Sequence, residues 1–147
     1  MSLKLQQLKT ELSAELDAIL AYWSKNTIDN KKGGFVGQID VNEDTIADAD
    51  KGSVLNARIL WSFSAGYQVT KNEEHKKMAE RAFKFLANHF YDPEFGGLFW
   101  SINADTTPKD TKNQIYALAF AIYGLTEYYV ISKEEKALEI AINLYLQ

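Results

Sequence analysis

The chain has 147 residues, 46% hydrophobic and 13% aromatic, which is enough apolar material for the core of one domain and excludes disorder as its main state. Its 16 Lys and Arg residues against 20 Asp and Glu residues give a net charge of -4, so neither nucleic acid nor an anionic membrane surface is expected as a partner. The absence of cysteine excludes disulfides, thiolate metal sites and thiol nucleophiles.

The first twenty residues do not contain the continuous apolar core of a signal peptide, because charged residues such as Lys9 and Glu11 interrupt them. The two longest charge-free stretches, 59–70 and 113–126, are shorter than the roughly 20 residues that a bilayer crossing needs. We therefore expect a cytoplasmic protein without a membrane-spanning segment.

The first half of the chain predicts three helices and one hairpin. Apolar residues at steps of three and four positions predict an amphipathic helix that ends near Asn26; these residues are Leu5, Leu8, Leu12, Leu16, Ile19, Leu20 and Trp23. Residues 32–42 alternate around paired glycines and predict a short strand or hairpin that opens an acidic loop. A second helix is expected over Gly52–Val69 and a third over Glu73–Phe90, whose acidic first turn suits the helix dipole.

The second half of the chain repeats this order. Residues 95–103 again alternate around a glycine pair, a polar loop follows, and a fourth helix is expected over Asn113–Val130. Ser132 to Glu135 has the Ser-x-x-Glu pattern of a capping box, which predicts a fifth helix from Lys133 that is still running at Gln147.

These pieces form an internal repeat. The segment Gly33-Gly34-Phe35 returns as Gly96-Gly97-Leu98, 63 residues later, and Lys51 returns as Lys112, 61 residues later. Each unit is a hairpin, a helix, a short loop and a second helix, with a period of about 60 residues. The second and fourth helices are apolar on nearly all sides, whereas the third and fifth have charged outer faces. The sequence therefore predicts an inner and an outer ring of helices.

Residues 51–66, and above all the run Leu55-Asn-Ala-Arg-Ile-Leu-Trp61, resemble the cellobiose 2-epimerase branch of the N-acylglucosamine 2-epimerase family. Supporting matches are Gly33-Gly34-Phe35, Gly96-Gly-Leu-Phe-Trp-Ser101 and Asn113-Gln-Ile-Tyr-Ala-Leu-Ala-Phe120. The resemblance covers essentially the whole chain, but only as the N-terminal part of the family.

The resemblance implies an all-α fold, an α/α toroid of six helix hairpins, which agrees with the repeat. Six helix pairs of about 60 residues each would need on the order of 360 residues. Residues 1–147 are therefore expected to form a single domain that is the N-terminal part of a truncated barrel, with about five helices and short β-hairpins in its loops. The open edges of such a partial barrel would expose apolar helices, and we expect self-association through them.

The function that the resemblance implies is a sugar 2-epimerase, which interconverts the glucose and mannose configurations at the reducing end of a β-1,4-linked disaccharide. One histidine removes the C2 proton, an enediolate forms, and a second histidine returns a proton on the other face, without a metal or another cofactor. Those histidines belong to later repeats beyond residue 147, so the chain by itself is expected to be inactive. Cellobiose, N-acetylglucosamine and free mannose all remain open as the substrate.

Two side chains match sugar-contacting positions of the family. Arg58 matches an arginine at the reducing-end oxygens, where a fixed cation would stabilise the enediolate, and Tyr116 matches an aromatic hydroxyl in the same cavity. Trp100, on the rim formed by the second hairpin, is a further candidate for stacking on a sugar. The residues alone leave two other interpretations open, a buried Arg58 paired with a carboxylate and a Tyr116 in the core.

Other polar residues carry weaker signals. His75 and His89 are expected on the surface of an outer helix and are given no catalytic role. The Asp-x-Asn-x-Asp pattern at 40–44 begins like a calcium loop, but Thr45 and Lys51 stand where that loop needs Gly and Glu, so no metal site is expected.

Several alternative functions stay open. A glycoside hydrolase on the same toroid would need two opposed carboxylates, for which Asp48, Asp50 and Asp105 are the candidates. An N-acylglucosamine 2-epimerase or an aldose-ketose isomerase is a further alternative within the enzymes. A carbohydrate-binding or helical interaction domain without catalysis is the alternative outside the enzymes.

Overall fold

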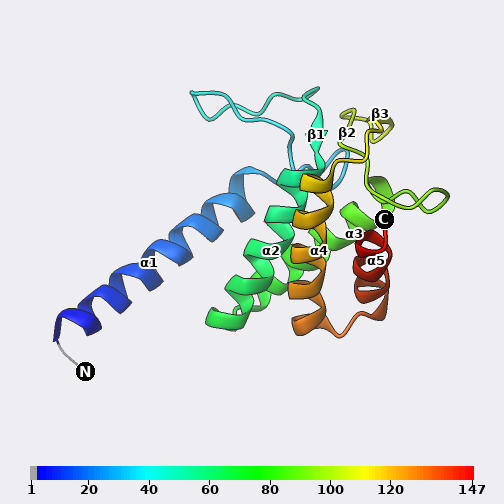
Figure 1. Ribbon diagram of the computed structural model, residues 1–147. Coiled ribbons are helices and arrows are strands. Elements are labelled where there is room, and N and C mark those ends of the chain that lie inside the picture. Colours follow the sequence, from blue (N-terminus) through cyan, green and yellow to red (C-terminus); the bar gives the residue numbers. More distant parts are fainter. Residues whose placement is uncertain (1–2) are drawn as a thin grey trace.

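A computed structural model describes residues 3–147, which form five helices and a small three-stranded sheet (Figure 1). In chain order the elements are α1 (Leu3–Asn26), β1 (Lys51–Gly52), α2 (Ser53–Thr70), α3 (Glu73–His89), β2 (Ser101–Ile102), β3 (Pro108–Asp110), α4 (Ile115–Ser132) and α5 (Glu135–Tyr145). The five predicted helices are confirmed, with ends that differ from the predicted ones by a few residues.

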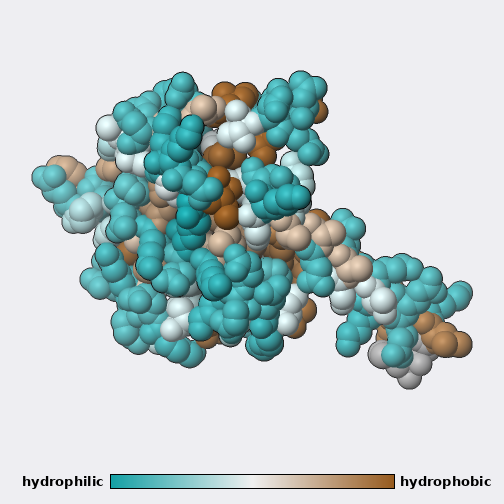
Figure 2. Space-filling model, turned by 180° about the vertical axis from the view of Figure 1, so that it is seen from behind, coloured by the Kyte–Doolittle hydropathy of each residue, from teal (hydrophilic) through white to brown (hydrophobic). Residues whose placement is uncertain are grey.

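The inner pair of helices, α2 and α4, lie side by side and run in the same direction (Figure 1), while α3 packs against α2 and α5 packs against α4. The two inner helices pack so closely at Gly124 that a Cβ atom there would lie 2.6 Å from the carbonyl oxygen of Ala57. The back of the molecule, seen in Figure 2, is covered largely by hydrophilic residues. The predicted inner and outer layers are therefore present.

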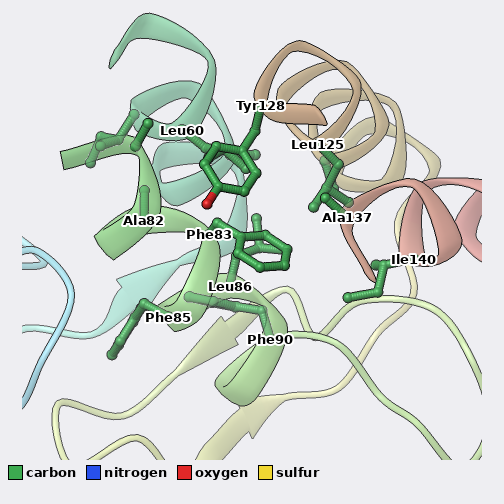
Figure 3. Packing of buried hydrophobic residues seen from close by; sticks show 14 of the residues in the cluster. Leu60, Ala82, Phe83, Phe85, Leu86, Phe90, Leu125, Tyr128, Ala137 and Ile140 are labelled. Atoms are coloured by element: carbon green, nitrogen blue, oxygen red, sulfur yellow. The ribbon is translucent and has the colours of Figure 1, made fainter. Parts of the chain in front are cut away.

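The core lies between the inner and outer helices (Figure 3). Phe83 of α3 stacks on Tyr128 of α4 with ring centroids 4.7 Å apart, and Leu60, Leu86 and Leu125 around them are fully buried. Burying side chains of this size stabilises the fold by about 1.5–3 kcal/mol each. The apolar face of each outer helix is thus held against its inner neighbours.

The two halves of the chain repeat in structure as they do in sequence. Isolated β-bridges join Ile28 to Phe35 and Tyr91 to Leu98, again 63 residues apart, and the paired glycines between them have positive φ. Of the short strand or hairpin expected within 32–42, the strand is absent, because this segment is turn and loop; antiparallel bridges Ile28–Phe35 and Ile39–Thr45 close it as a hairpin, called the first hairpin below. The sheet instead has the antiparallel order β1-β2-β3 and joins the start of α2 to the second hairpin.

The end of α4 corrects the predicted capping box. Ser132 is the last residue of α4, and Lys133, the C-cap of that helix, has a left-handed backbone conformation with φ 59°. The Ser132 hydroxyl accepts a hydrogen bond from the backbone N–H of Glu134, not from Glu135. The fifth helix therefore begins at Glu135, two residues after the expected start at Lys133. It ends at Tyr145, whereas the sequence predicted a helix that is still running at Gln147.

The first helix is confirmed, but most of its apolar stripe is not buried. Leu20 packs against Gly66 of α2, where an added Cβ would lie 2.5 Å from a Leu20 methyl carbon. Further toward the N-terminus α1 leaves the body of the molecule, and Leu8 and Leu12 are 49% and 62% exposed (Figures 1 and 2). The pattern predicted the helix without indicating what covers its apolar face.

Among the described helices, α4 has the length and apolar composition to cross a membrane, a test that core helices of soluble proteins also pass. It packs against α2 and α5, so its composition is also that of an inner helix. The expectations of no membrane span and of a cytoplasmic location stay predictions.

Candidate functional site

Arg58 lies on the exposed face of α2, one to two turns after the helix begins. Its guanidinium carbon is 5.9 Å from the ring centroid of Phe120 on α4, within the range of a cation–π contact. None of the ion pairs among residues 3–147 includes Arg58. The interpretation of Arg58 as a buried arginine paired with a carboxylate is therefore wrong.

Tyr116 projects from the second position of α4 and is 60% exposed, so it is not a core tyrosine. Its ring meets the ring of Phe120 edge to face, with centroids 4.9 Å apart and planes at 68°. Phe120 therefore contacts Arg58 and Tyr116 at once. The structure brings these two predicted residues together from two helices that are far apart in the sequence.

Trp100 is fixed to the N-terminal end of α2. Its backbone carbonyl accepts hydrogen bonds from both the N–H and the hydroxyl of Ser53, the first residue of α2, each 3.0 Å long. The indole is partly exposed, and no ring contact among the described residues joins it to Arg58 or Tyr116. Trp100 is thus placed at the loop end of α2, where its backbone carbonyl binds Ser53.

A second aromatic pair continues the seam between α2 and α4. Trp61 and Tyr123 stack with ring centroids 5.1 Å apart, and Tyr123 is half exposed on the same side of α4 as Tyr116. The indole nitrogen of Trp61 is buried and has no hydrogen-bond partner. The sequence analysis missed Phe120, Trp61 and Tyr123, although spacings of four and seven residues from Tyr116 place two of them near its face.

A cavity of about 280 Å³ opens between α1 and α2 beside Arg58. Trp23 of α1 forms one wall, and Arg58 and Ser62 of α2 contribute polar groups to the other. The remaining lining is apolar, so this side of Arg58 has the mixed character typical of small-molecule sites.

The histidines do not stand on this face. His75 is only 4% exposed, which corrects the expectation of a surface residue; its Nδ1 lies 2.9 Å from the Thr70 hydroxyl oxygen and its ring packs near Phe63. His89, at the end of α3, is partly buried, and burial followed by the charge of Lys51 lowers its pKa. Neither lies in the inner layer that carries Arg58 and Tyr116.

The loop carboxylates are engaged in local contacts. Asp48 pairs with Lys32 at 2.9 Å, Asp50 pairs with Lys109, and Asp105 accepts a hydrogen bond from the Thr107 hydroxyl. Hydrogen bonds from Lys32 and from Thr107 hold the pKa values of Asp48 and Asp105 below the ordinary value, so both are poor general acids.

The acidic turn at 40–44 is also locally satisfied. The Asp40 carboxylate accepts the backbone N–H groups of Asn42 and Asp44. Among residues 3–147 no three metal-ligating side chains gather to hold an ion.

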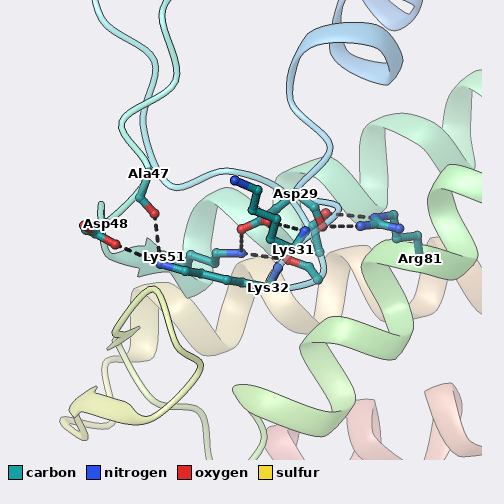
Figure 4. Close-up of polar contacts among 9 residues, drawn as sticks. Asp29, Lys31, Lys32, Ala47, Asp48, Lys51 and Arg81 are labelled. Carbon is teal, nitrogen blue, oxygen red and sulfur yellow. Dashed lines mark hydrogen bonds and ion pairs between the residues drawn. The ribbon is translucent and has the colours of Figure 1, made fainter.

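A network of charged groups anchors the first hairpin to β1 and α3 (Figure 4). The buried ammonium of Lys51 binds the Asp29 carboxylate at 2.8 Å and the carbonyl of Gly33 at 2.7 Å. Arg81 of α3 donates to the backbone carbonyls of Asp29 and Gly34. Burial lowers the pKa of Lys51, although its bond to Asp29 opposes this. The network fixes the loop that leads into the helix carrying Arg58.

Known proteins match the same part of the chain that builds this site. The N-acylglucosamine 2-epimerase (GlcNAc 2-epimerase) family matches residues 33–145, a range that includes Arg58, Trp100 and Tyr116. The chain belongs to this family. The match confirms the resemblance that was based on residues 51–66.

Relatives in the family are cellobiose 2-epimerases. The enzyme of that name from Bacteroides fragilis is 49% identical over 139 residues, which cover 94% of this chain and 36% of the relative. The solved structure of cellobiose 2-epimerase from Spirochaeta thermophila superposes with a TM-score of 0.86 at 32% identity, over 98% of this chain and 37% of that one. The five helices are therefore part of an α/α barrel. The chain spans little more than one third of the length of these relatives.

The same fold occurs with other activities. A family 76 glycoside hydrolase from a bovine Bacteroides thetaiotaomicron strain superposes with a TM-score of 0.73 at 21% identity, over 88% of this chain. At that identity the likeness concerns the fold alone, so the reaction has to be argued from the side chains.

Proposed function

We propose that this chain is part of a sugar 2-epimerase and supplies one wall of its active site. The observation that carries the proposal is the pairing of Arg58 and Tyr116 on adjacent inner helices, both exposed and both in contact with Phe120. An arginine without a carboxylate partner among residues 3–147, next to an aromatic hydroxyl, suits the oxygens of a sugar better than it suits the interior of a helical core.

The proposed chemistry is proton transfer at C2 of an open-chain sugar. Removal of the C2 proton puts negative charge on the oxygens at C1 and C2, and the fixed cation of Arg58 would stabilise that charge. The Tyr116 hydroxyl would hydrogen-bond the same unit. His75 and His89 lie in the outer layer, so we propose that the bases come from residues of the family's longer chain.

The substrate that we propose is a β-1,4-linked disaccharide, epimerised at its reducing-end glucose or mannose unit. Two features support this: the relatives are named cellobiose 2-epimerase, and Trp100 stands at the loop end of α2, where a second sugar unit would lie over the rim. The reaction as proposed uses neither a metal nor another cofactor.

The test is C2 proton exchange by the full-length protein. The protein is incubated with cellobiose in heavy water, and NMR follows both deuterium at C2 and the appearance of the mannose-configured epimer. N-acetylglucosamine and free mannose, run in parallel, decide between this substrate and those of the alternative epimerase or isomerase. Binding of cellobiose without exchange or turnover would contradict the proposal and favour a non-catalytic carbohydrate-binding domain.

The two arginines of this chain provide a matched pair of variants. Arg58→Ala is expected to lower kcat about 10²- to 10³-fold, the usual cost of removing one donor to a developing oxyanion. Arg81→Ala removes the same charge from a residue that binds only backbone carbonyls of the first hairpin, so stability should fall while kcat changes little. Near-normal turnover of Arg58→Ala would refute substrate contact.

We further propose that the 147-residue chain by itself is inactive and self-associates. The exposed apolar residues of α1, among them Leu8 and Leu12, and Ile115 at the start of α4 would be covered in such an assembly. Light scattering after size-exclusion chromatography measures the mass, and a monodisperse monomer would refute this part of the proposal.

A further inference from the structure

Phe120 is the neighbour that the two proposed sugar-contacting residues share. The Arg58 guanidinium lies over its ring, and the Tyr116 ring meets it edge to face from one helical turn earlier on α4. Neither Arg58 nor Tyr116 has a side-chain hydrogen bond or ion pair to another described residue that would fix its direction. The ring is therefore the group that orients both.

Free arginine and tyrosine side chains sample several rotamers, and ordering them when a ligand binds costs free energy. A ring that already holds both in place removes part of this cost. The negative π face of Phe120 attracts the guanidinium, and the edge-to-face contact with Tyr116 uses the positive edge of one ring against the face of the other. Both attractions depend on an aromatic ring, which an aliphatic side chain of similar volume does not provide.

We propose that Phe120 is a positioning residue, which holds Arg58 and Tyr116 in the geometry that receives the sugar. The inference rests on the proposed function, because the two residues that it orients are the proposed sugar contacts. It assigns Phe120 no contact with the sugar itself.

Phe120 also packs at the edge of the core, so a purely structural role has to be distinguished from positioning. Phe120→Leu keeps an apolar side chain but removes the ring, and Phe120→Tyr restores a ring of the same shape. Tyr129→Leu is the control, since Tyr129 is a partly buried aromatic on the same helix that contacts Lys133 and Glu135 at the far end of α4.

The experiment measures kcat and KM of the full-length protein for these variants and for Arg58→Ala. We expect Phe120→Leu to lower kcat/KM about 2- to 30-fold, mostly through kcat, which is the range of a cation–π contact expressed as a rate. Phe120→Tyr should restore the wild-type value, and Tyr129→Leu should not change it. In the Arg58→Ala background, Phe120→Leu should cause little further loss. An unchanged kcat/KM for Phe120→Leu, failure of Phe120→Tyr to rescue, or an additive loss in the Arg58→Ala background would each overturn the inference.

A second readout separates this inference from the proposed function. The ring current of Phe120 shifts the side-chain NMR signals of Arg58, which the Arg58→Lys variant assigns. Phe120→Leu should move these signals and Phe120→Tyr should leave them in place, whether or not the protein epimerises any sugar. If wild-type protein shows no C2 exchange, the proposed function fails, and moved signals still support the orientation of Arg58 by Phe120. Signals that stay in place in Phe120→Leu would refute the orientation itself.

Discussion

The buried ammonium of Lys51 offers the sharpest test of how the first hairpin is held. Its side chain is 2% exposed and binds the Asp29 carboxylate and the Gly33 carbonyl. Lys51→Met keeps the long apolar stem of the side chain but removes the charge. The change leaves a carboxylate that is 13% exposed without its cation, and a backbone carbonyl without its donor.

Breaking a buried ion pair from one side costs about 3–5 kcal/mol, because the remaining charge is no longer compensated. Asp29 keeps the backbone N–H groups of Lys31 and Lys32 at 3.0 and 2.8 Å, so the low end of that range applies. We expect Lys51→Met to lower the free energy of unfolding by about 3 kcal/mol. For a domain of this size that corresponds to a decrease in Tm of roughly 6–12 °C.

Urea unfolding of wild type and variants measures the change. Lys112→Met is the matched control, since this lysine occupies the equivalent position of the second repeat but pairs with Asp110 at 3.8 Å while 73% exposed. Its effect should stay within about 0.5 kcal/mol. Asp29→Asn combined with Lys51→Met should recover at least about 1 kcal/mol of the loss, because it removes the uncompensated charge. Equal effects of the two lysine variants would refute the reasoning.

Two further predictions concern the same hairpin. Gly34→Ala should lower the free energy of unfolding in urea by at least about 1–2 kcal/mol, because φ is 62° and the new Cβ would lie 2.5 Å from the Phe85 ring. The control is Gly52→Ala, where φ is −93° and no atom lies within 4 Å, so the free energy of unfolding should change by less than about 0.5 kcal/mol. Equal losses in the two variants would contradict the steric argument. Burial tends to raise the pKa of Asp29, but the hydrogen bond from Lys51 and those from two backbone N–H groups outweigh it and hold the pKa below its ordinary value. Because the folded pKa is the lower one, the stabilisation is complete above the unfolded value of 3.8 and is lost as the pH falls through the folded pKa. The urea midpoint should therefore fall more steeply below about pH 4 in wild type than in Asp29→Asn, and parallel declines would contradict it.

The elements that the sequence predicted well are those determined by local patterns. The 3.6-residue periodicity identified α1 and α3, and the uniformly apolar composition of α2 and α4 correctly indicated an inner layer. Paired glycines marked both hairpins because their backbone has positive φ, which other residues rarely adopt. The boundary between α4 and α5 was less accurate, since Lys133 takes a left-handed conformation that its residue type does not indicate.

Long-range packing decided the rest. Charged neighbours in the sequence suggested a surface position for His75, but Thr70 and Phe63 enclose it because α3 turns that side toward α2. The sequence alone determined the helices and the repeat, and its resemblance to the family selected Arg58 and Tyr116 as candidates. Only the tertiary structure decided that these two meet on Phe120, because that contact depends on the close approach of α2 and α4, which residues about sixty positions apart create.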